Sequence, residues 1–117
     1  SDCLDVVGER IDGGVDMLVV TTGALDASDE TCNRLMEKLS TYLHAALHPN
    51  FKNVYPAARD GRVRIFVSDS HEVSERAKAM VQSFALEAMA RNVEVRIGSP
   101  VFGQAVATGR RDEAAWD

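Results

Sequence analysis

The chain has 117 residues, the size of a single domain that can bury a hydrophobic core of its own. Its 18 acidic and 13 basic residues give a net charge of −5 and a sequence pI near 5.1. This balance argues against a surface for nucleic acid or an anionic membrane, because phosphate groups are bound by clustered Lys and Arg. No apolar run approaches the roughly 20 residues that a membrane span needs, and no signal-peptide pattern is visible. We therefore expect a globular, cytoplasmic protein.

The first strong structural signal is the stretch Val15–Thr22. Its uninterrupted apolar run, Met17 to Val20, is typical of a strand buried on both faces inside a parallel sheet. A second apolar stretch, Leu4–Ile11, precedes it, and Asp12-Gly13-Gly14 lies between the two. Such a turn sequence predicts a hairpin, because tight hairpin turns need positive φ angles.

A helix is predicted next, with Asp26 or Ser28 as the cap of its first amides and an end near Leu47 before Pro49. Apolar residues recur in it at intervals of three and four and form one stripe. The stripe consists of Cys32, Leu35, Met36, Leu39, Leu43, Ala46 and Leu47.

The second half of the chain repeats the strand–helix order. Residues 49–61 are predicted to be irregular and to be held to the body by Phe51, Val54 and Tyr55. A core strand over 62–67 is followed by a helix from about Glu72 to Arg91, for which Asp69 and Glu72 suggest a variant capping box. The inner stripe of this helix is Val73, Ala77, Met80, Val81, Phe84 and Ala88, and a short alternating strand over 93–97 follows.

The order β-β-α-β-α-β predicts an α/β domain over residues 1–98. We expect a mostly parallel four-stranded sheet with an N-terminal hairpin and two helices, because a strand–helix–strand crossover places its strands in parallel. Residues 99–117 form a C-terminal tail that is too apolar to be free, with Val101, Phe102, Val106 and Trp116. The tail is expected to pack on the domain or on a partner chain.

Two groups of polar residues follow core strands and form a candidate ligand site. In open α/β sheets, ligands bind beyond the carboxyl ends of the strands. Thr22 and Ser28 follow one predicted strand, and Asp69 and His71 follow the next. A small polar ligand is one interpretation, and helix capping by Asp26, Ser28, Asp69 and Ser70 is the other. Capping explains all of them except His71.

The sequence predicts no catalytic residue, no cofactor and no metal site. It contains no Gly-x-Ser-x-Gly elbow, no phosphate-binding Gly-rich loop and no dinucleotide fingerprint. His44 and His48 are four residues apart on the first helix, with Glu37 on the same stripe, but no further strong ligand is in reach. Cys3 and Cys32 have no zinc-binding spacing, and Cys32 is expected to be a small buried thiol.

The second helix has an apolar strip opposite its core stripe. Ala79, Leu86 and Ala90 lie there, with Met89 to one side. A surface helix seldom carries a second apolar strip unless something covers it. Either the tail covers it through Phe102 or Trp116, or another chain does, as a partner or a second copy.

The chain resembles an uncharacterised family of small bacterial α/β domains. The similarity covers roughly residues 5–97 and lies in strand, loop, cap and helix positions: Val15 to Val20, Gly23, Leu25, Asp26, Ser28, Glu30, Thr31, Leu35 and Arg62 to Ile65. The resemblance implies a bacterial α/β domain. It implies no activity, and it carries over no catalytic residue.

Two functional hypotheses follow from the sequence. The first is a non-enzymatic interaction or regulatory module, such as the immunity component of a toxin pair, which contacts a protein partner or itself through the Leu86 strip. The second is a small-molecule-binding domain or weak enzyme with its site at the carboxyl ends of the core strands. Nucleic-acid binding would need the arginines at 59, 62, 64, 91 and 96 to form one patch, which the intervening acidic residues oppose.

Overall fold

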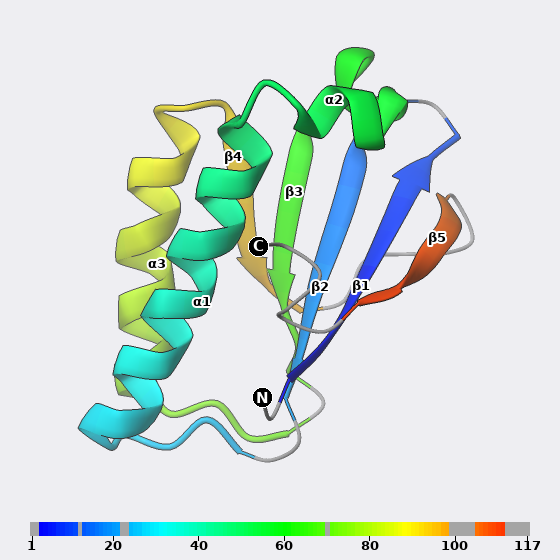
Figure 1. The fold of residues 1–117 in the computed structure, drawn as a ribbon. Helices are drawn as coiled ribbons and strands as arrows, with labels where there is room; N and C mark the ends of the chain where they lie inside the picture. The colour runs from blue at the N-terminus through cyan, green and yellow to red at the C-terminus, as the bar shows by residue number, and fades with distance from the viewer. Residues whose placement is uncertain (1–2, 12, 22–23, 70, 99–104, 112–117) are drawn as a thin grey trace.

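A computed structural model describes residues 3–11, 13–21, 24–69, 71–98 and 105–111; for residues 3–6, 21 and 105–111 only the backbone is described. The chain forms one five-stranded sheet with two long helices (Figure 1). The elements in order are β1 (Cys3–Arg10), β2 (Val15–Thr21), α1 (Asp29–Leu47), α2 (Phe51–Val54), the 3₁₀ turn η1 (Pro56–Arg59), β3 (Val63–Val67), α3 (Glu75–Met89), β4 (Val93–Ile97) and β5 (Ala105–Arg111).

The strand order in the sheet is β4-β3-β2-β1-β5. The predicted hairpin is confirmed, because β1 and β2 pair antiparallel with Val7 opposite Met17. The two predicted crossovers are confirmed as well, since β2 pairs with β3 and β3 with β4 in parallel. The prediction of a mostly parallel, four-stranded sheet was wrong. The sheet is mixed and five-stranded, because β1 pairs antiparallel both with β2 and, on its other side, with a fifth strand, while the β2–β3 and β3–β4 pairs are parallel.

The fifth strand comes from the region expected to be a tail. Residues 105–111 pair with β1 from Asp5 to Arg10, with a register shift between Val7 and Gly8. The sequence Ala-Val-Ala-Thr-Gly-Arg-Arg has little of the β-branched and aromatic content that favours a strand, so no strand was expected there. Phe102 and Trp116, the tail residues proposed to cover the second helix, lie outside the described residues.

Both long helices pack on the same face of the sheet (Figure 1). The order explains this arrangement, because the two crossovers step in the same direction and right-handed crossovers then place their helices on one side. Helix α1 ends at Leu47 as predicted and starts after its N-cap Ser28. Helix α3 starts three residues later than predicted, because Ser74 caps it, and not the Asp69 and Glu72 pair.

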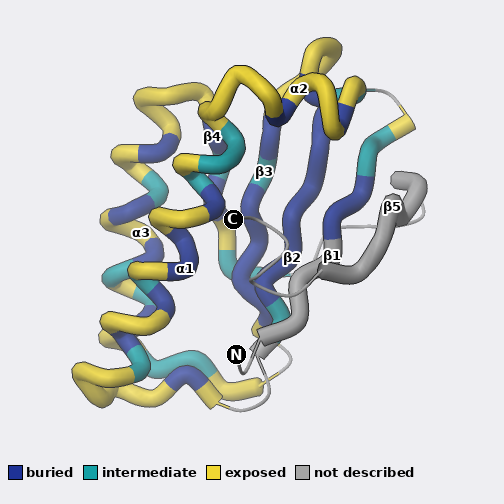
Figure 2. Tube along the Cα trace, viewed as in Figure 1, coloured by how far each residue is buried: buried dark blue, intermediate teal, exposed yellow. Residues whose placement is uncertain are grey.

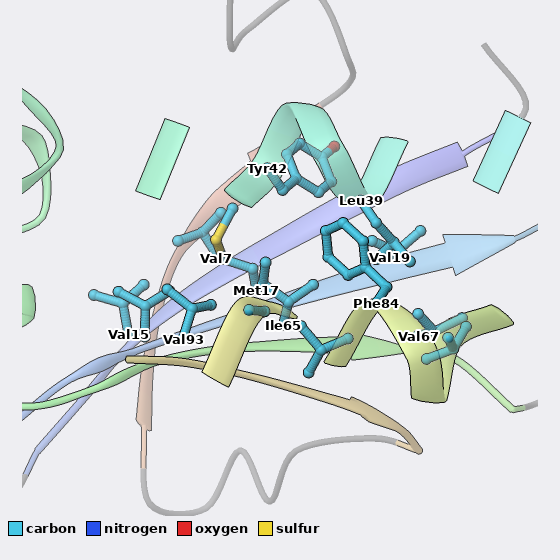
Figure 3. Close-up of a cluster of buried hydrophobic side chains, with 14 of the residues drawn as sticks. Val7, Val15, Met17, Val19, Leu39, Tyr42, Ile65, Val67, Phe84 and Val93 are labelled. Atoms are coloured by element: carbon cyan, nitrogen blue, oxygen red, sulfur yellow. The ribbon is translucent and has the colours of Figure 1, made fainter. Parts of the chain in front are cut away.

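The hydrophobic core lies between the sheet and the two helices (Figure 3). Alternate residues of the central strands point into it, as the two-residue period of a strand requires. Figure 3 labels Val7, Val15, Met17, Val19, Leu39, Tyr42, Ile65, Val67, Phe84 and Val93, and all of these are buried. The predicted inner stripe of α3 is confirmed for Ala77, Val81, Phe84 and Ala88, which are buried, and for Met80, which packs against the core. Val73 also packs against the core, but it lies in the loop before α3 and not in the helix.

The stretch between α1 and β3 is more ordered than expected. It forms α2 and η1, and Figure 1 places it across the ends of β2 and β3 where those strands begin. Phe51 and Tyr55 are buried, with ring centroids 5.1 Å apart, so they hold this stretch to the body as predicted. Val54, which was expected to do the same, is largely exposed.

The other face of the sheet carries the alternate strand residues and is not covered by α1 or α3. Leu18 and Phe66 are buried there, and the Arg64 guanidinium lies 5.3 Å from the centroid of the Phe66 ring. Figure 2 shows β2 and β3 as mostly buried and the outward sides of both long helices as exposed. None of the described helices is long and apolar enough to cross a membrane.

The turn between β1 and β2 lies against the turn that precedes β3, at the point where β2 and β3 begin. The N–H of Gly14 donates to the carbonyl oxygen of Ala57 at 2.7 Å. A Cβ on Gly14 would lie 1.9 Å from Nη2 of Arg10 and 2.6 Å from the carbonyl oxygen of Arg62, and φ there is +95°. A Cβ on Gly61 would lie 2.7 Å from the Gly14 nitrogen. The close contact between the two turns therefore requires glycine for space as well as for backbone conformation.

We predict that Gly14→Ala destabilises the protein more than Gly98→Ala. Both glycines have positive φ, but a Cβ on Gly98, with φ +136°, meets nothing within 4 Å. Gly98→Ala should therefore cost only the backbone strain, about 1–3 kcal/mol. Gly14→Ala should cost about 1–3 kcal/mol more, because Arg10 and the backbone must shift. Urea unfolding of both variants measures the difference, and equal losses would contradict the close contact between the two turns.

Candidate functional site

The loops that leave β2 and β3 at their carboxyl ends lie side by side. An isolated parallel bridge joins Leu25 to Val73. The N–H of Leu25 donates to the carbonyl oxygen of Glu72, and the N–H of Ser74 donates to that of Leu25, both at 2.8 Å. The guanidinium of Arg76 also crosses between the loops, with a 2.6 Å ion pair to Asp29. The two polar segments of the candidate ligand site are thus held next to each other.

The four candidate ligand residues are placed differently. Thr22 lies outside the described residues. Ser28 is the N-cap of α1, and its hydroxyl accepts a hydrogen bond from the N–H of Thr31 at 3.2 Å. Asp69 and His71 are exposed in the loop after β3, and no hydrogen bond or ion pair engages them among the described residues. The capping interpretation therefore accounts for Ser28, while Asp69 and His71 remain accessible.

Asp26 completes the cap of α1. Its carboxylate accepts hydrogen bonds from the Ser28 hydroxyl at 2.6 Å and from the Ser28 N–H at 2.9 Å. These two bonds, the hydroxyl first and then the N–H, hold the pKa of Asp26 below its ordinary value. The acidic groups Asp29 and Glu30 follow in the first turn of α1. Negative charge at this helix start disfavours an anionic ligand there.

The metal-ligating residue types do not gather in the described part of the chain. No group of three or more His, Cys, Asp or Glu side chains that could hold a metal ion occurs within it. His44 is exposed on α1, and Nδ1 of His48 accepts a hydrogen bond from the N–H of Asn50 at 3.1 Å. His48 is the C-cap residue of α1, and its side chain binds the backbone of the turn that follows the helix. Cys32 is a buried thiol, as predicted.

The apolar strip of α3 is on the surface. Leu86 is 78% exposed and Met89 is 44% exposed, and Ala79 and Ala90 are exposed as well. At 100° per residue, Leu86 points directly away from the buried stripe of α3. The outward side of α3 between 79 and 90 carries no charged residue: it consists of Ala79, Gln82, Ser83, Leu86, Met89 and Ala90.

A cluster that sequence reasoning missed lies on the face of the sheet opposite the helices. Asp16 is only 1% exposed, and its carboxylate lies between two guanidinium groups. Arg64 donates to it from Nε and from Nη2, each at 2.7 Å, and Arg10 donates to it from Nη1. Nη2 of Arg10 also donates to the carbonyl oxygen of Arg62 at 2.8 Å. The signal for this cluster was a single Asp inside a buried apolar strand.

The geometry of the Asp16 cluster indicates a structural role. The carboxylate is enclosed, and both arginines are engaged with it through the strand register, in which Asp16 and Arg64 are direct partners. Removing one charged partner from a buried cluster leaves the remaining charges uncompensated, which is strongly destabilising. This cluster joins three neighbouring strands, because Arg10 is on β1, Asp16 on β2 and Arg64 on β3.

We predict that Asp16→Asn lowers the free energy of unfolding by about 3 kcal/mol, because it leaves two guanidiniums facing an uncharged group in a buried site. Asp29→Asn is the matched control. Asp29 also pairs with an arginine, but its side chain is 83% exposed, so this change should cost less than about 1 kcal/mol. Urea unfolding measures both values. Similar losses for the two variants would contradict the buried role of Asp16.

We predict that Ser28→Ala raises the pKa of Asp26 toward its ordinary value, because it removes the hydroxyl that lowers this pKa most. With the pKa lowered in the folded state, the charged cap stabilises the protein fully above the unfolded pKa of about 3.9. This contribution is lost as pH falls through the folded pKa. An NMR titration of the Asp26 carboxyl group tests the prediction. Ser40→Ala, at an exposed position on α1, is the control, and an unchanged titration in Ser28→Ala would contradict it.

Comparisons with protein-family models, with curated proteins and with solved structures found no significant match to this chain.

Proposed function

We propose that this protein is a non-enzymatic interaction module, and that a protein partner covers the outer face of α3. The observation that carries the proposal is the exposure of Leu86, at 78%, within an uncharged helix side. The central parts of protein interfaces are poor in charged residues and are built around large apolar side chains. A single exposed leucine is ordinary, but here Met89, Ala79 and Ala90 extend the apolar surface around it.

The charge of the chain favours a basic partner. A net charge of −5 steers association with a positively charged surface. Glu75 and Glu87 are exposed on α3, where they can serve as the polar rim of the contact. A regulatory or neutralising protein of the immunity type, which binds one basic partner, fits this combination of features.

We predict that Leu86→Asp abolishes capture of a stoichiometric protein partner from the native lysate and leaves the fold unchanged. The test compares tagged wild type, Leu86→Asp and Ile11→Asp, with and without nuclease, by mass spectrometry. Ile11 is a matched control, because it is 77% exposed but lies in the β1–β2 turn. With the partner then purified, Leu86→Asp should raise the dissociation constant at least about tenfold, as expected for an interface anchor.

Three outcomes would count against the proposal. They are the absence of any partner, a partner lost on nuclease treatment, and equal binding by wild type and Leu86→Asp. Circular dichroism of the variants is the control for folding. A partner that is lost in both Leu86→Asp and Ile11→Asp would place the contact elsewhere.

The second candidate function is a small-molecule-binding domain or weak enzyme at the carboxyl ends of β2 and β3. The favouring observation is that the Leu25–Val73 bridge joins the two loops while Asp69 and His71 remain accessible. An NMR titration with small neutral polar compounds and small amines tests it, because the acidic groups Asp29 and Glu30 disfavour anions there. Saturable shifts confined to Ser28, Asp69 and His71 would support this function, and unchanged spectra would remove it.

A further inference from the structure

The edge of β4 away from β3 pairs with no other strand in the part of the chain that the structure describes. In the sheet order, β4 is the last strand on its side among the strands that the structure describes. The N–H of Gly98 donates to the carbonyl oxygen of Val67 at 2.8 Å, so alternate backbone groups of this strand face β3. The N–H and C=O groups of Val93, Val95 and Ile97 therefore point to the outer edge. An open edge is a template for another strand.

The β4 sequence is complementary to itself. In an antiparallel pair of two copies centred on Val95, Val93 faces Ile97, Val95 faces Val95, and Glu94 faces Arg96 of the second copy. The outward backbone groups of Val93, Val95 and Ile97 then form the hydrogen-bonded pairs. Glu94 and Arg96 occupy the alternate pairs, in which opposite side chains are closest.

Charge selects this register. A shift by one residue of the two-fold centre places Glu94 opposite Glu94, or Arg96 opposite Arg96, and like charges directly opposite each other are unfavourable. In the single chain, Glu94 and Arg96 pair with each other at 2.9 Å along one side of the strand. The same two groups can exchange these contacts for equivalent ones across the axis, so neither charge loses its partner.

Helix α3 lies beside this edge and contributes two apolar residues, Ala85 and Met89, on that side. Arg76 reaches Asp29 and the carbonyl oxygen of Ala27, which fixes the side of α3 that faces α1. At 100° per residue, Ala85 lies half a turn around from Arg76, and Met89 and Lys78 lie on the same side. Lys78 is two turns before Ala85 and pairs with Glu75 at 3.3 Å. Since α3 packs on β4, these residues lie on the side of the open edge. Met89, 44% exposed, can thus pack against the second copy.

We propose that a second copy of this chain pairs antiparallel with the outer edge of β4, centred on Val95, and forms a two-fold dimer with one continuous sheet. Such a contact is isologous and closed, because each Glu94 meets the Arg96 of the other copy. The surface is separate from the outer face of α3, so this inference goes beyond the proposed function and does not depend on it.

The test is charge reversal on the edge strand, with the oligomeric state measured by sedimentation velocity and native mass spectrometry. Wild type is expected to dimerise. Glu94→Arg and Arg96→Glu each place like charges opposite each other, and each should raise the dimer dissociation constant at least about tenfold. An equal mixture of the two variants should form a heterodimer, because all facing charges are then opposite. The double variant Glu94→Arg/Arg96→Glu should dimerise by itself.

The controls carry the same charge changes away from the edge. Glu37→Arg on α1 and Lys52→Glu on α2 are at exposed positions, and both should dimerise as wild type does. Circular dichroism excludes loss of fold in each variant. A wild type that is monomeric at every concentration would overturn the proposal. So would dimers that survive both single reversals, or dimers that only Leu86→Asp disrupts; that last result would place self-association on the outer face of α3.

Discussion

The ion cluster around Asp16 holds β1, β2 and β3 in register. A carboxylate that is 1% exposed must keep its donors, and those donors come from the strands on either side. Because side chains alternate along a strand, a slip by one residue would move Asp16 into the apolar layer under the helices. The cluster therefore fixes the registers of β1, β2 and β3 together. It also explains the close contact at Gly14, because the Arg10 guanidinium occupies the space that a side chain there would need.

The sequence predicted correctly the elements that depend on residues close together in the chain. Apolar runs gave the central strands, the Gly13-Gly14 pair gave the hairpin, and three- and four-residue spacings gave the buried sides of both long helices. Features that depend on distant residues were missed. The burial of Asp16 needs Arg64, which is 48 positions away. Lys38 is buried beside the Tyr42 ring, 5.7 Å from its centroid, and a lysine on a helix is ordinarily expected in solvent. Strand β5 depends on the edge that β1 offers, and its own sequence contains no comparable signal.

Capping and ligand binding compete for the same groups at the carboxyl ends of β2 and β3. The hydroxyl oxygens of Ser28 and Ser74 accept hydrogen bonds from backbone N–H groups in the first turns of α1 and α3. The Asp26 carboxylate accepts a hydrogen bond from the N–H of Ser28. A ligand at this edge would have to replace those bonds or use only Asp69 and His71. The sequence identified polar residues after two strands, and the structure places the two loops that carry them side by side. The sequence alone could not distinguish helix capping from ligand binding, because both roles use the same residue types after a strand.

The two proposed surfaces have a joint consequence that neither has alone. In the β4 dimer, both α3 helices lie on the same face of one continuous sheet, and their outer sides point away from it. The uncharged strip around Leu86 would then occur twice on one side of the assembly. A partner that is itself two-fold could engage both strips at once, and the second contact would be intramolecular. Such bivalent binding gains affinity from geometry and not from new contacts. A small interaction module with few anchor residues can hold a partner tightly by this means.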